Sequence, residues 1–247
     1  MAWEWDAETY DTLALPHELW GRRTVARLAL TGGETVVDAG CGTGRDTAAL
    51  LDALPRGRVF AVDASASMLE RLRARLPDVG EHLTVVAADL RDPLPITEPV
   101  DAVMSVAALH WIDDHRRVFG NLAAVLRPGG RLSVDCGGQG NIATVEAVLR
   151  QILGDLPDVW TFAGPAATRE HLEAAGFVDV DARLRPDRAY FAEPAALHDY
   201  LETVVLGAHL ARLGPDERAA LVHEVARRLP EPAVDYVRLE VSARRAG

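Results

Sequence analysis

The pattern of apolar and polar positions changes from strand-like to helix-like and back along the first two-thirds of the chain. Runs rich in valine, leucine and alanine predict five short strands, at residues 35–38, 58–62, 83–87, 101–106 and 131–135. Amphipathic stretches predict helices around and between them, at 17–30, about 45–54, after Ser65 or Ser67, and about 114–126. Strands that alternate with helices are typical of βαβ units, so we expect an α/β fold with a parallel sheet covered on both faces.

Local signals mark where two of these helices begin or end. Ser67 and Glu70 have the spacing of a capping box, in which each side chain hydrogen-bonds the backbone at the start of a helix. The sequence RPGG at 127–130 predicts a helix end followed by a turn, because proline cannot continue a helix and glycine favours the turn.

The last third of the chain has a different pattern. A glycine-rich loop at 137–141 precedes helix patterns at about 142–153 and 168–175, and a strand at 178–184. Two more helical stretches, at about 194–213 and 215–229, come before a final strand near 236–241. We interpret the two helices between the late strands as an insertion over one edge of the sheet.

Composition excludes several classes of protein. The 247 residues are 49% hydrophobic and 26% charged, which is typical of a folded domain and not of a disordered or collagen-like chain. The two cysteines lack the partners that a zinc or iron–sulfur site requires, so no metal is expected. The absence of lysine excludes Schiff-base chemistry and a Walker phosphate loop. The net charge of -11 disfavours nucleic acid as a partner.

No segment is typical of membrane insertion or export. Apolar runs stay below the roughly 18 residues that a membrane span needs. The opening MAWEWDAETY lacks the basic segment and apolar stretch of a signal peptide. We therefore expect a cytoplasmic protein with no membrane partner.

The strongest motif is VDAGCGTG at 37–44, where an apolar strand enters a glycine-rich loop that opens a helix. Glycines let the backbone turn sharply and let a ligand lie against bare main chain, although a plain tight turn needs them too. The dinucleotide fingerprint G-x-G-x-x-G is not met, because Arg45 stands in place of the third glycine. Asp38, at the strand end, would repel a pyrophosphate and suits a ligand that carries positive charge.

Two further acids follow the next two strands. Asp63 ends the strand at 58–62, where a carboxylate can accept both hydroxyls of a ribose. Asp89 follows the strand at 83–87, where it can accept a hydrogen bond from an adenine amino group. Each alone fits a turn or cap acid. Together, beside the glycine loop, they indicate a ligand site at the carboxyl ends of the strands.

The pattern Asp38-x-Gly40-x-Gly42-x-Gly44, with Asp63 and Asp89, resembles the class I S-adenosylmethionine-dependent methyltransferases over residues of about 30–136. The family implies a seven-stranded, mostly parallel, doubly wound Rossmann-like sheet with the last strand antiparallel. It implies S-adenosylmethionine as cofactor, with Gly40 and Gly42 at the methionine moiety, Asp63 at the ribose, and Asp89 with Leu90 at the adenine. The cofactor-binding set that we take from it is Asp38, Ala39, Gly40, Cys41, Gly42, Asp63, Ala64, Met68, Ala88, Asp89, Leu90 and Ser105.

Within that family, three segments are similar to the trans-aconitate methyltransferases and their relatives. They are AALHW at 107–111, RPGG at 127–130, and the opening Trp3-x-Trp5-Asp6 with Tyr10. This resemblance implies a small-molecule acceptor, with O-methylation of a carboxylate as the first hypothesis. We expect one domain over 1–247, made of an N-terminal lid and helices (1–30), a cofactor-binding core (31–136) and a last part (137–247) with late strands and a helical cap at about 194–230.

His110 is the candidate catalytic residue, because it follows the fourth strand, where an acceptor would lie. A phenol, alcohol or amine acceptor benefits from a general base, whereas a carboxylate is already ionised at neutral pH. Contact with the substrate, or simple packing, are the other interpretations of His110. Trp111 fits either a wall of the acceptor site or an anchor for the next helix.

Trp3, Trp5 and Tyr10 gather three aromatic side chains at the N-terminus. We interpret them as a lid that covers bound cofactor and substrate and excludes water, with plain packing on the sheet as the alternative.

Other functions remain open at the level of sequence. N-, C- or phenol O-methylation uses the same fold, so the fold does not choose among them. A nicotinamide-dependent oxidoreductase and a non-catalytic cofactor-binding protein are further alternatives. A polycarboxylate acceptor would need arginines, and those near the insertion fit solvated faces equally well: Arg183, Arg185, Arg188 and Arg212.

Overall fold

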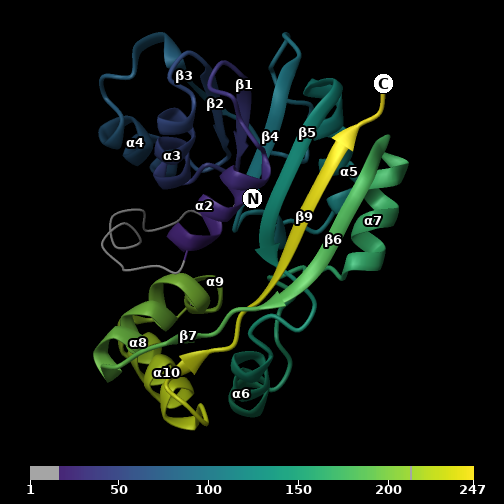
Figure 1. The fold of residues 1–247 in the computed structure, drawn as a ribbon. Coiled ribbons are helices and arrows are strands. Elements are labelled where there is room, and N and C mark those ends of the chain that lie inside the picture. The colour runs from purple at the N-terminus through teal and green to yellow at the C-terminus, as the bar shows by residue number, and fades with distance from the viewer. Residues whose placement is uncertain (1–16, 212) are drawn as a thin grey trace.

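The computed structural model describes residues 17–211 and 213–247. One sheet is built from β1 (Thr35–Ala39), β2 (Arg58–Asp63), β3 (Leu83–Ala87), β4 (Val100–Val106), β5 (Leu126–Gly137), β6 (Phe177–Pro186) and β9 (Val237–Arg245). Their order is β3-β2-β1-β4-β5-β9-β6 (Figure 1). β9 runs antiparallel to both of its neighbours, whereas the other pairs are parallel. The expected seven-stranded sheet with an antiparallel last strand is confirmed.

Helices cover both faces of this sheet (Figure 1). One face carries α2 (His17–Arg27), α3 (Arg45–Ala53) and α4 (Ala66–Arg75), and the other carries α5 (His115–Val125) and α7 (Pro165–Ala174). Successive residues of β1 pack against the helices on opposite faces of the sheet. Val36 belongs to the hydrophobic cluster that contains Leu50 of α3, and Val37 to the cluster that contains Val118 of α5. A strand buried on both faces reads as a continuous apolar run, which is why the sequence predicts it.

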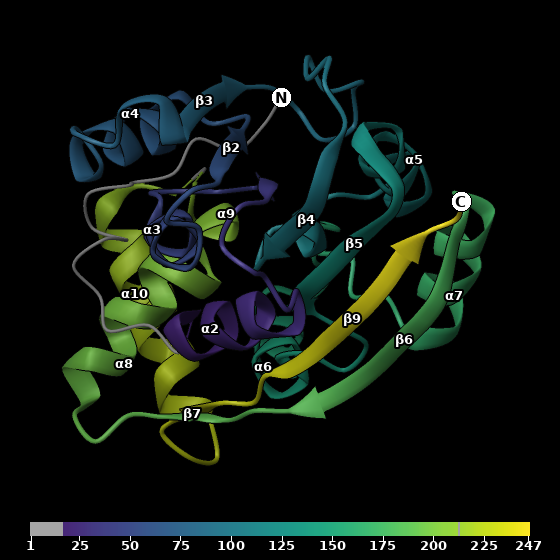
Figure 2. The ribbon, with the colours of Figure 1, turned by 45° about the horizontal axis from the view of Figure 1, so that its top comes forward.

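A helical cap lies beyond the carboxyl end of β5 (Figure 1). It contains α8 (Pro194–Tyr200), α9 (Gly207–Leu210), α10 (Pro215–Arg228) and a ribbon of β7 (Ala189–Tyr190) and β8 (Ala233–Val234), with α6 (Ala143–Leu153) beside it. The chain leaves β6 through β7 and returns through β8 into β9, as Figure 2 shows. The cap is therefore an excursion between two neighbouring strands of the sheet.

Two expected helix features differ from the structure. The helix expected at about 194–213 is broken, because Leu201–Val205 forms a π turn before α9 begins at Gly207. α4 is capped by Ser65, whose Oγ accepts a hydrogen bond from the Met68 amide at 3.3 Å, so the capping box of Ser67 and Glu70 is wrong. Ser65 is extended (ψ 121°), which is the geometry of an N-cap, and the helix begins at the next residue.

Candidate active site

A cavity of about 660 Å³ lies at the carboxyl ends of β1, β2, β3 and β4 and extends under the cap. Its size lies within the usual range for small-molecule and cofactor sites. The segments after the four strands line one part: Gly40–Thr43, Asp63–Ser65, Ala88–Arg91 and Val106–Ala108. Residues of the 154–164 loop, the cap and β9 line the other part.

The glycine loop is held close to the neighbouring strands. The amides of Gly40 and Cys41 donate to the carbonyl of Val62 at 2.8 and 3.0 Å. Gly40 has φ +80°, and a Cβ added there would lie 2.3 Å from the Cβ of Ala108. A Cβ added at Gly42 would meet nothing within 4 Å, because that face opens on the cavity. The loop thus leaves room for a ligand to lie against its backbone.

Asp63 is fixed at the edge of this loop. Its Oδ2 accepts from the Gly42 amide and its Oδ1 from the Ser65 amide, both at 2.9 Å. The side chain lines the cavity together with Ala64 and Met68. These bonds orient a negative group toward the cavity, which fits the hydroxyls of a ribose.

Asp89 lines the cavity but is engaged by a cation. Arg91 reaches both of its oxygens, with an Nη2–Oδ2 distance of 2.6 Å, and hydrogen bonding to Arg91 lowers the pKa of Asp89. Ala88 and Leu90 line the cavity beside it. The role of this segment at the adenine remains a prediction.

Three residues of the expected cofactor set lie behind the cavity wall. Asp38 is 1% exposed and accepts from Thr47 Oγ1 at 2.7 Å, and burial raises its pKa to about 7. Ser105 is buried and donates from Oγ to the carbonyl of Ala39 at 2.7 Å. Asp38, Ala39 and Ser105 are absent from the cavity lining, so among the described residues their contacts support the loop.

His110 and Trp111 lie in a short 3-10 turn after β4, and both line the cavity. The Gly137 amide donates to Nδ1 of His110 at 3.3 Å. A backbone N–H is only a donor, so Nδ1 carries no hydrogen and the neutral ring holds its proton on Nε2. In this tautomer Nδ1 is an acceptor already engaged by Gly137, and the donor of the ring is Nε2.

The aromatic wall that faces this turn was not predicted from the sequence. Trp160 and Phe162 line the cavity and stack with ring centroids 5.8 Å apart and planes 15° apart. Trp111 lies 6.4 Å from Trp160, and His110 lies 6.0 Å from Phe162. The only sequence signal was a pair of aromatic residues two positions apart in a stretch without clear periodicity.

Two cavity-lining residues have strained backbones. Ala107 and Ile142 have positive φ values of 54° and 49°. Such conformations cost energy in residues other than glycine and gather at functional sites. Ala107 is held by a hydrogen bond from its amide to the Asp135 carbonyl at 2.7 Å, and Ile142 by one to the Asp235 carbonyl at 3.0 Å.

Trp3, Trp5 and Tyr10, expected at the substrate, lie outside the described residues. Among residues 17–211 and 213–247, no three histidine, cysteine, aspartate or glutamate side chains form a metal-binding group. Over the same residues, no helix has both the length and the apolar character to span a bilayer.

Comparisons with known proteins agree with this geometry. Residues 36–130 match the family model described as a methyltransferase domain. The trans-aconitate 2-methyltransferase of Methylobacterium nodulans is 31% identical over 182 residues, which cover 73% of this chain and 67% of the relative. This chain belongs to the S-adenosylmethionine-dependent methyltransferase family. The expected class I methyltransferase is confirmed.

Other methyltransferases match over shorter lengths or in fold alone. The trans-aconitate 2-methyltransferase of Azoarcus sp. is 39% identical over 130 residues, 53% of this chain and 49% of the relative. The chain thus aligns with about half the length of the first curated relatives. Phosphoethanolamine N-methyltransferase 2 of Haemonchus contortus, solved with phosphomonomethylethanolamine and S-adenosylhomocysteine, shares the fold, with a TM-score of 0.63, 17% identity, and coverage of 93% of this chain and 53% of that chain.

Proposed function

We propose that this methyltransferase transfers the methyl group of S-adenosylmethionine to the carboxylate of a small molecule. The observation that carries the proposal is one continuous cavity, with the glycine loop and Asp63 in one part and His110 in the other. A cofactor held at the loop and an acceptor beside His110 would share this space. The relatives named trans-aconitate 2-methyltransferase support a carboxylic acid as the acceptor.

The residues of the loop fit the cofactor. The open face of Gly42 would leave room for its methionine part, and Asp63, held by the Gly42 amide, would accept the ribose hydroxyls. Met68, Ala88 and Leu90 supply apolar surface for the adenine. The bound cofactor supplies a sulfonium methyl group as the electrophile.

His110 supports a carboxylate acceptor in particular. A carboxylate is ionised at neutral pH and needs no general base, and His110 in the tautomer set by Gly137 presents an N–H. That N–H can hold one carboxylate oxygen while the other faces the methyl group. Alignment of the two reactants is the main source of rate in such a displacement.

The net charge of -11 supports a small acceptor over nucleic acid. We also propose a cytoplasmic location, in keeping with the two free cysteines, Cys41 and Cys136.

The proposal is tested by calorimetric titration of S-adenosylhomocysteine into the wild type and Asp63→Ala. We expect the wild type to bind and the variant to bind at least 10-fold more weakly. Asp52→Ala is the matched control, because Asp52 is an exposed acid on α3 that does not line the cavity. Absence of binding to the wild type, by heat and by thermal shift, would overturn the proposal.

A further inference from the structure

The part of the cavity away from the glycine loop is walled by rings. The rings of Trp160 and Phe162 are stacked, and the ring centroids of Trp160 and Trp111 are 6.4 Å apart. All three line the cavity. The planes of Trp111 and Trp160 are 54° apart, so the three rings give this part of the cavity an aromatic wall of the kind that packs against another ring.

The cap closes this part with small aliphatic side chains. Val204 and Val205 belong to the π turn, and Ala208 and Ala211 follow in and after α9. None of the four carries a polar side-chain atom. The space between the cap and the aromatic wall is therefore apolar on two sides.

Positive charge is scarce on the same walls. The arginines that line the cavity are Arg45, Arg91 and Arg238. Arg45 begins α3 at the glycine loop, and Arg91 binds Asp89 after β3, so both belong to the cofactor part. Residues 1–16 contain no lysine or arginine, and Arg212 is the one basic residue outside the described ranges. Arg238 is thus the single described guanidinium on the acceptor side.

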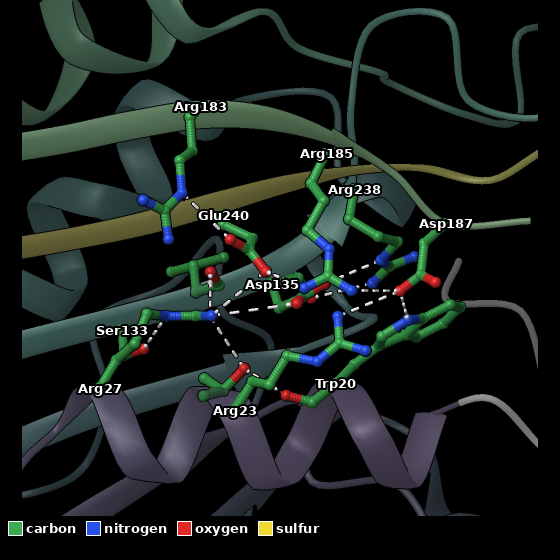
Figure 3. Close-up of polar contacts among 12 residues, drawn as sticks. Trp20, Arg23, Arg27, Ser133, Asp135, Arg183, Arg185, Asp187, Arg238 and Glu240 are labelled. Carbon is green, nitrogen blue, oxygen red and sulfur yellow. Dashed lines mark hydrogen bonds and ion pairs between the residues drawn. The ribbon is translucent and has the colours of Figure 1, made fainter.

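Arg238 belongs to a charged network that joins β9, β5, β6 and α2 (Figure 3). It binds Asp135, and the network continues through Arg27 and Glu240 to the arginines of β6. Five arginines of this network, Arg23, Arg27, Arg183, Arg185 and Arg238, meet four acids, Asp135, Asp181, Asp187 and Glu240. Arginines outnumber acids in this network, and Arg238 is the one of the five arginines that lines the cavity.

We propose that the acceptor is a monocarboxylic acid with a flat apolar body, and not a polycarboxylate like the one named for the relatives. One carboxylate can be held between Arg238 and His110: both line the cavity, and Gly137 links them, since its amide donates to Nδ1 of His110 and it pairs in register with Arg238. Further carboxylates would lie against Trp160, Phe162 and the cap, where the described lining has no second guanidinium to pair with them, and an unpaired buried charge is unfavourable. This inference rests on the proposed function and specifies the chemical class of its acceptor.

The reaction balances without a proton transfer. A carboxylate oxygen of the acceptor forms a bond to the methyl carbon as the sulfur–methyl bond breaks. The electron pair of that bond stays on sulfur, so the sulfonium and carboxylate charges disappear together. The products are a neutral methyl ester and a thioether, and the ester's apolar body suits the same aromatic wall.

The test compares trans-cinnamate, which has one carboxylate on a flat apolar body, with trans-aconitate, which has three carboxylates. Methyl ester formation is measured for each acid with S-adenosylmethionine, and each acid is titrated into the S-adenosylhomocysteine complex. We expect kcat/KM for trans-cinnamate to exceed that for trans-aconitate by at least 100-fold. Cinnamide, which lacks the charge, is expected to bind at least 10-fold more weakly than trans-cinnamate.

Two variants test the aromatic wall and the cap. Trp160→Ala is expected to lower kcat/KM for trans-cinnamate at least 10-fold through KM, with S-adenosylhomocysteine affinity within 2-fold of the wild type. Ala208→Phe fills the same space without removing a core side chain and is expected to have the same effect. Tyr190→Ala is the matched control, because Tyr190 is an exposed aromatic residue on β7 away from the cavity.

Preference for trans-aconitate, or comparable turnover of both acids, would overturn the inference and leave the proposed function standing. Failure of trans-cinnamate to bind the S-adenosylhomocysteine complex would also overturn it. Failure of the wild type to bind S-adenosylhomocysteine would overturn the proposed function itself. The three outcomes are therefore distinguishable.

Discussion

Arg238 donates a hydrogen bond from Nε to Oδ1 of Asp135 at 2.8 Å, and the two side chains are 1% and 0% exposed. The pair joins β9 to β5, and the guanidinium carbon lies 3.6 Å from the centre of the Trp20 ring on α2 (Figure 3). Arg238 also lines the cavity. One ion pair thus connects the sheet, a covering helix and the proposed acceptor site.

Replacing Arg238 with methionine is expected to destabilise the protein. The change leaves Asp135 as a buried, uncompensated carboxylate, since the remaining cation, Arg27, is 4.0 Å away. Loss of one partner of a buried pair costs about 3–5 kcal/mol. Urea unfolding of the wild type and Arg238→Met measures this difference.

The matched variant is the double substitution Arg238→Met with Asp135→Asn, which removes both charges. It is expected to recover a large part of the lost stability, because no buried charge remains. Equal free energies of unfolding for the single and double variants would contradict this account.

The ionisation of Asp38 is expected to make the free energy of unfolding depend on pH, and Asp38→Asn is expected to remove this dependence. Burial raises the pKa of Asp38 to about 7, well above the ordinary range of an aspartate. A raised carboxyl pKa means that the folded protein binds the proton more tightly than the unfolded chain does. Stability from this group is therefore full below about pH 4 and is lost as pH rises to about 7, at roughly 1.4 kcal/mol per unit.

The measurement is urea unfolding of the wild type and Asp38→Asn at pH 5 and pH 8, without cofactor. Thr47 Oγ1 donates to Asp38 at 2.7 Å in the wild type. It can donate in the same way to the side-chain oxygen of the asparagine, so the variant keeps this hydrogen bond. We expect the variant to gain about 2–3 kcal/mol over the wild type between the two pH values. Asp52→Asn, at an exposed site on the same helix as Thr47, should show no such change; parallel pH curves for Asp38→Asn and the wild type would exclude the raised pKa.

His209 offers a stabilising substitution in the cap. Both of its ring nitrogens are buried and have no hydrogen-bond partner among the described residues, and its ring packs 4.7 Å from that of Trp160. Burial lowers the pKa of His209, which keeps the ring neutral. Unsatisfied buried polar atoms cost about 1–3 kcal/mol, so His209→Leu is expected to raise the free energy of unfolding by an amount of that order.

Thermal and urea unfolding of His209→Leu check this expectation. His209→Gln is the control, because it keeps polar atoms in the same place and should bring no gain. A loss of stability in the leucine variant comparable to that of other core substitutions would show that the ring makes a favourable interaction in the folded protein.

The sequence predicted the part of the site that local rules control. A strand, a glycine loop and a helix start follow one another within 37–45, so residue types alone indicate a ligand cradle there. Gly40, Gly42 and Asp63 accordingly line the cavity. Asp38 belongs to the same motif, yet it points behind the loop to Thr47, a choice that depends on how α3 packs.

The acceptor side could not be predicted in the same way. Trp160 and Phe162 lie in a loop without periodicity, and only the fold brings them to Trp111, about fifty residues earlier in the chain. The break between α8 and α9 could not be predicted either, since the sequence pattern at 194–213 fits a continuous helix.

The sequence by itself determined the class of the fold and the glycine loop after β1, because alternating apolar segments and a glycine loop act over a few neighbouring residues. The tertiary structure decided which arginines line the cavity, which nitrogen of His110 accepts the Gly137 amide, and which rings form the cavity wall. These features depend on contacts between residues far apart in the chain, such as Gly137 with His110 and Arg238 with Asp135. Such contacts exist only once the sheet has assembled, so no local pattern records them.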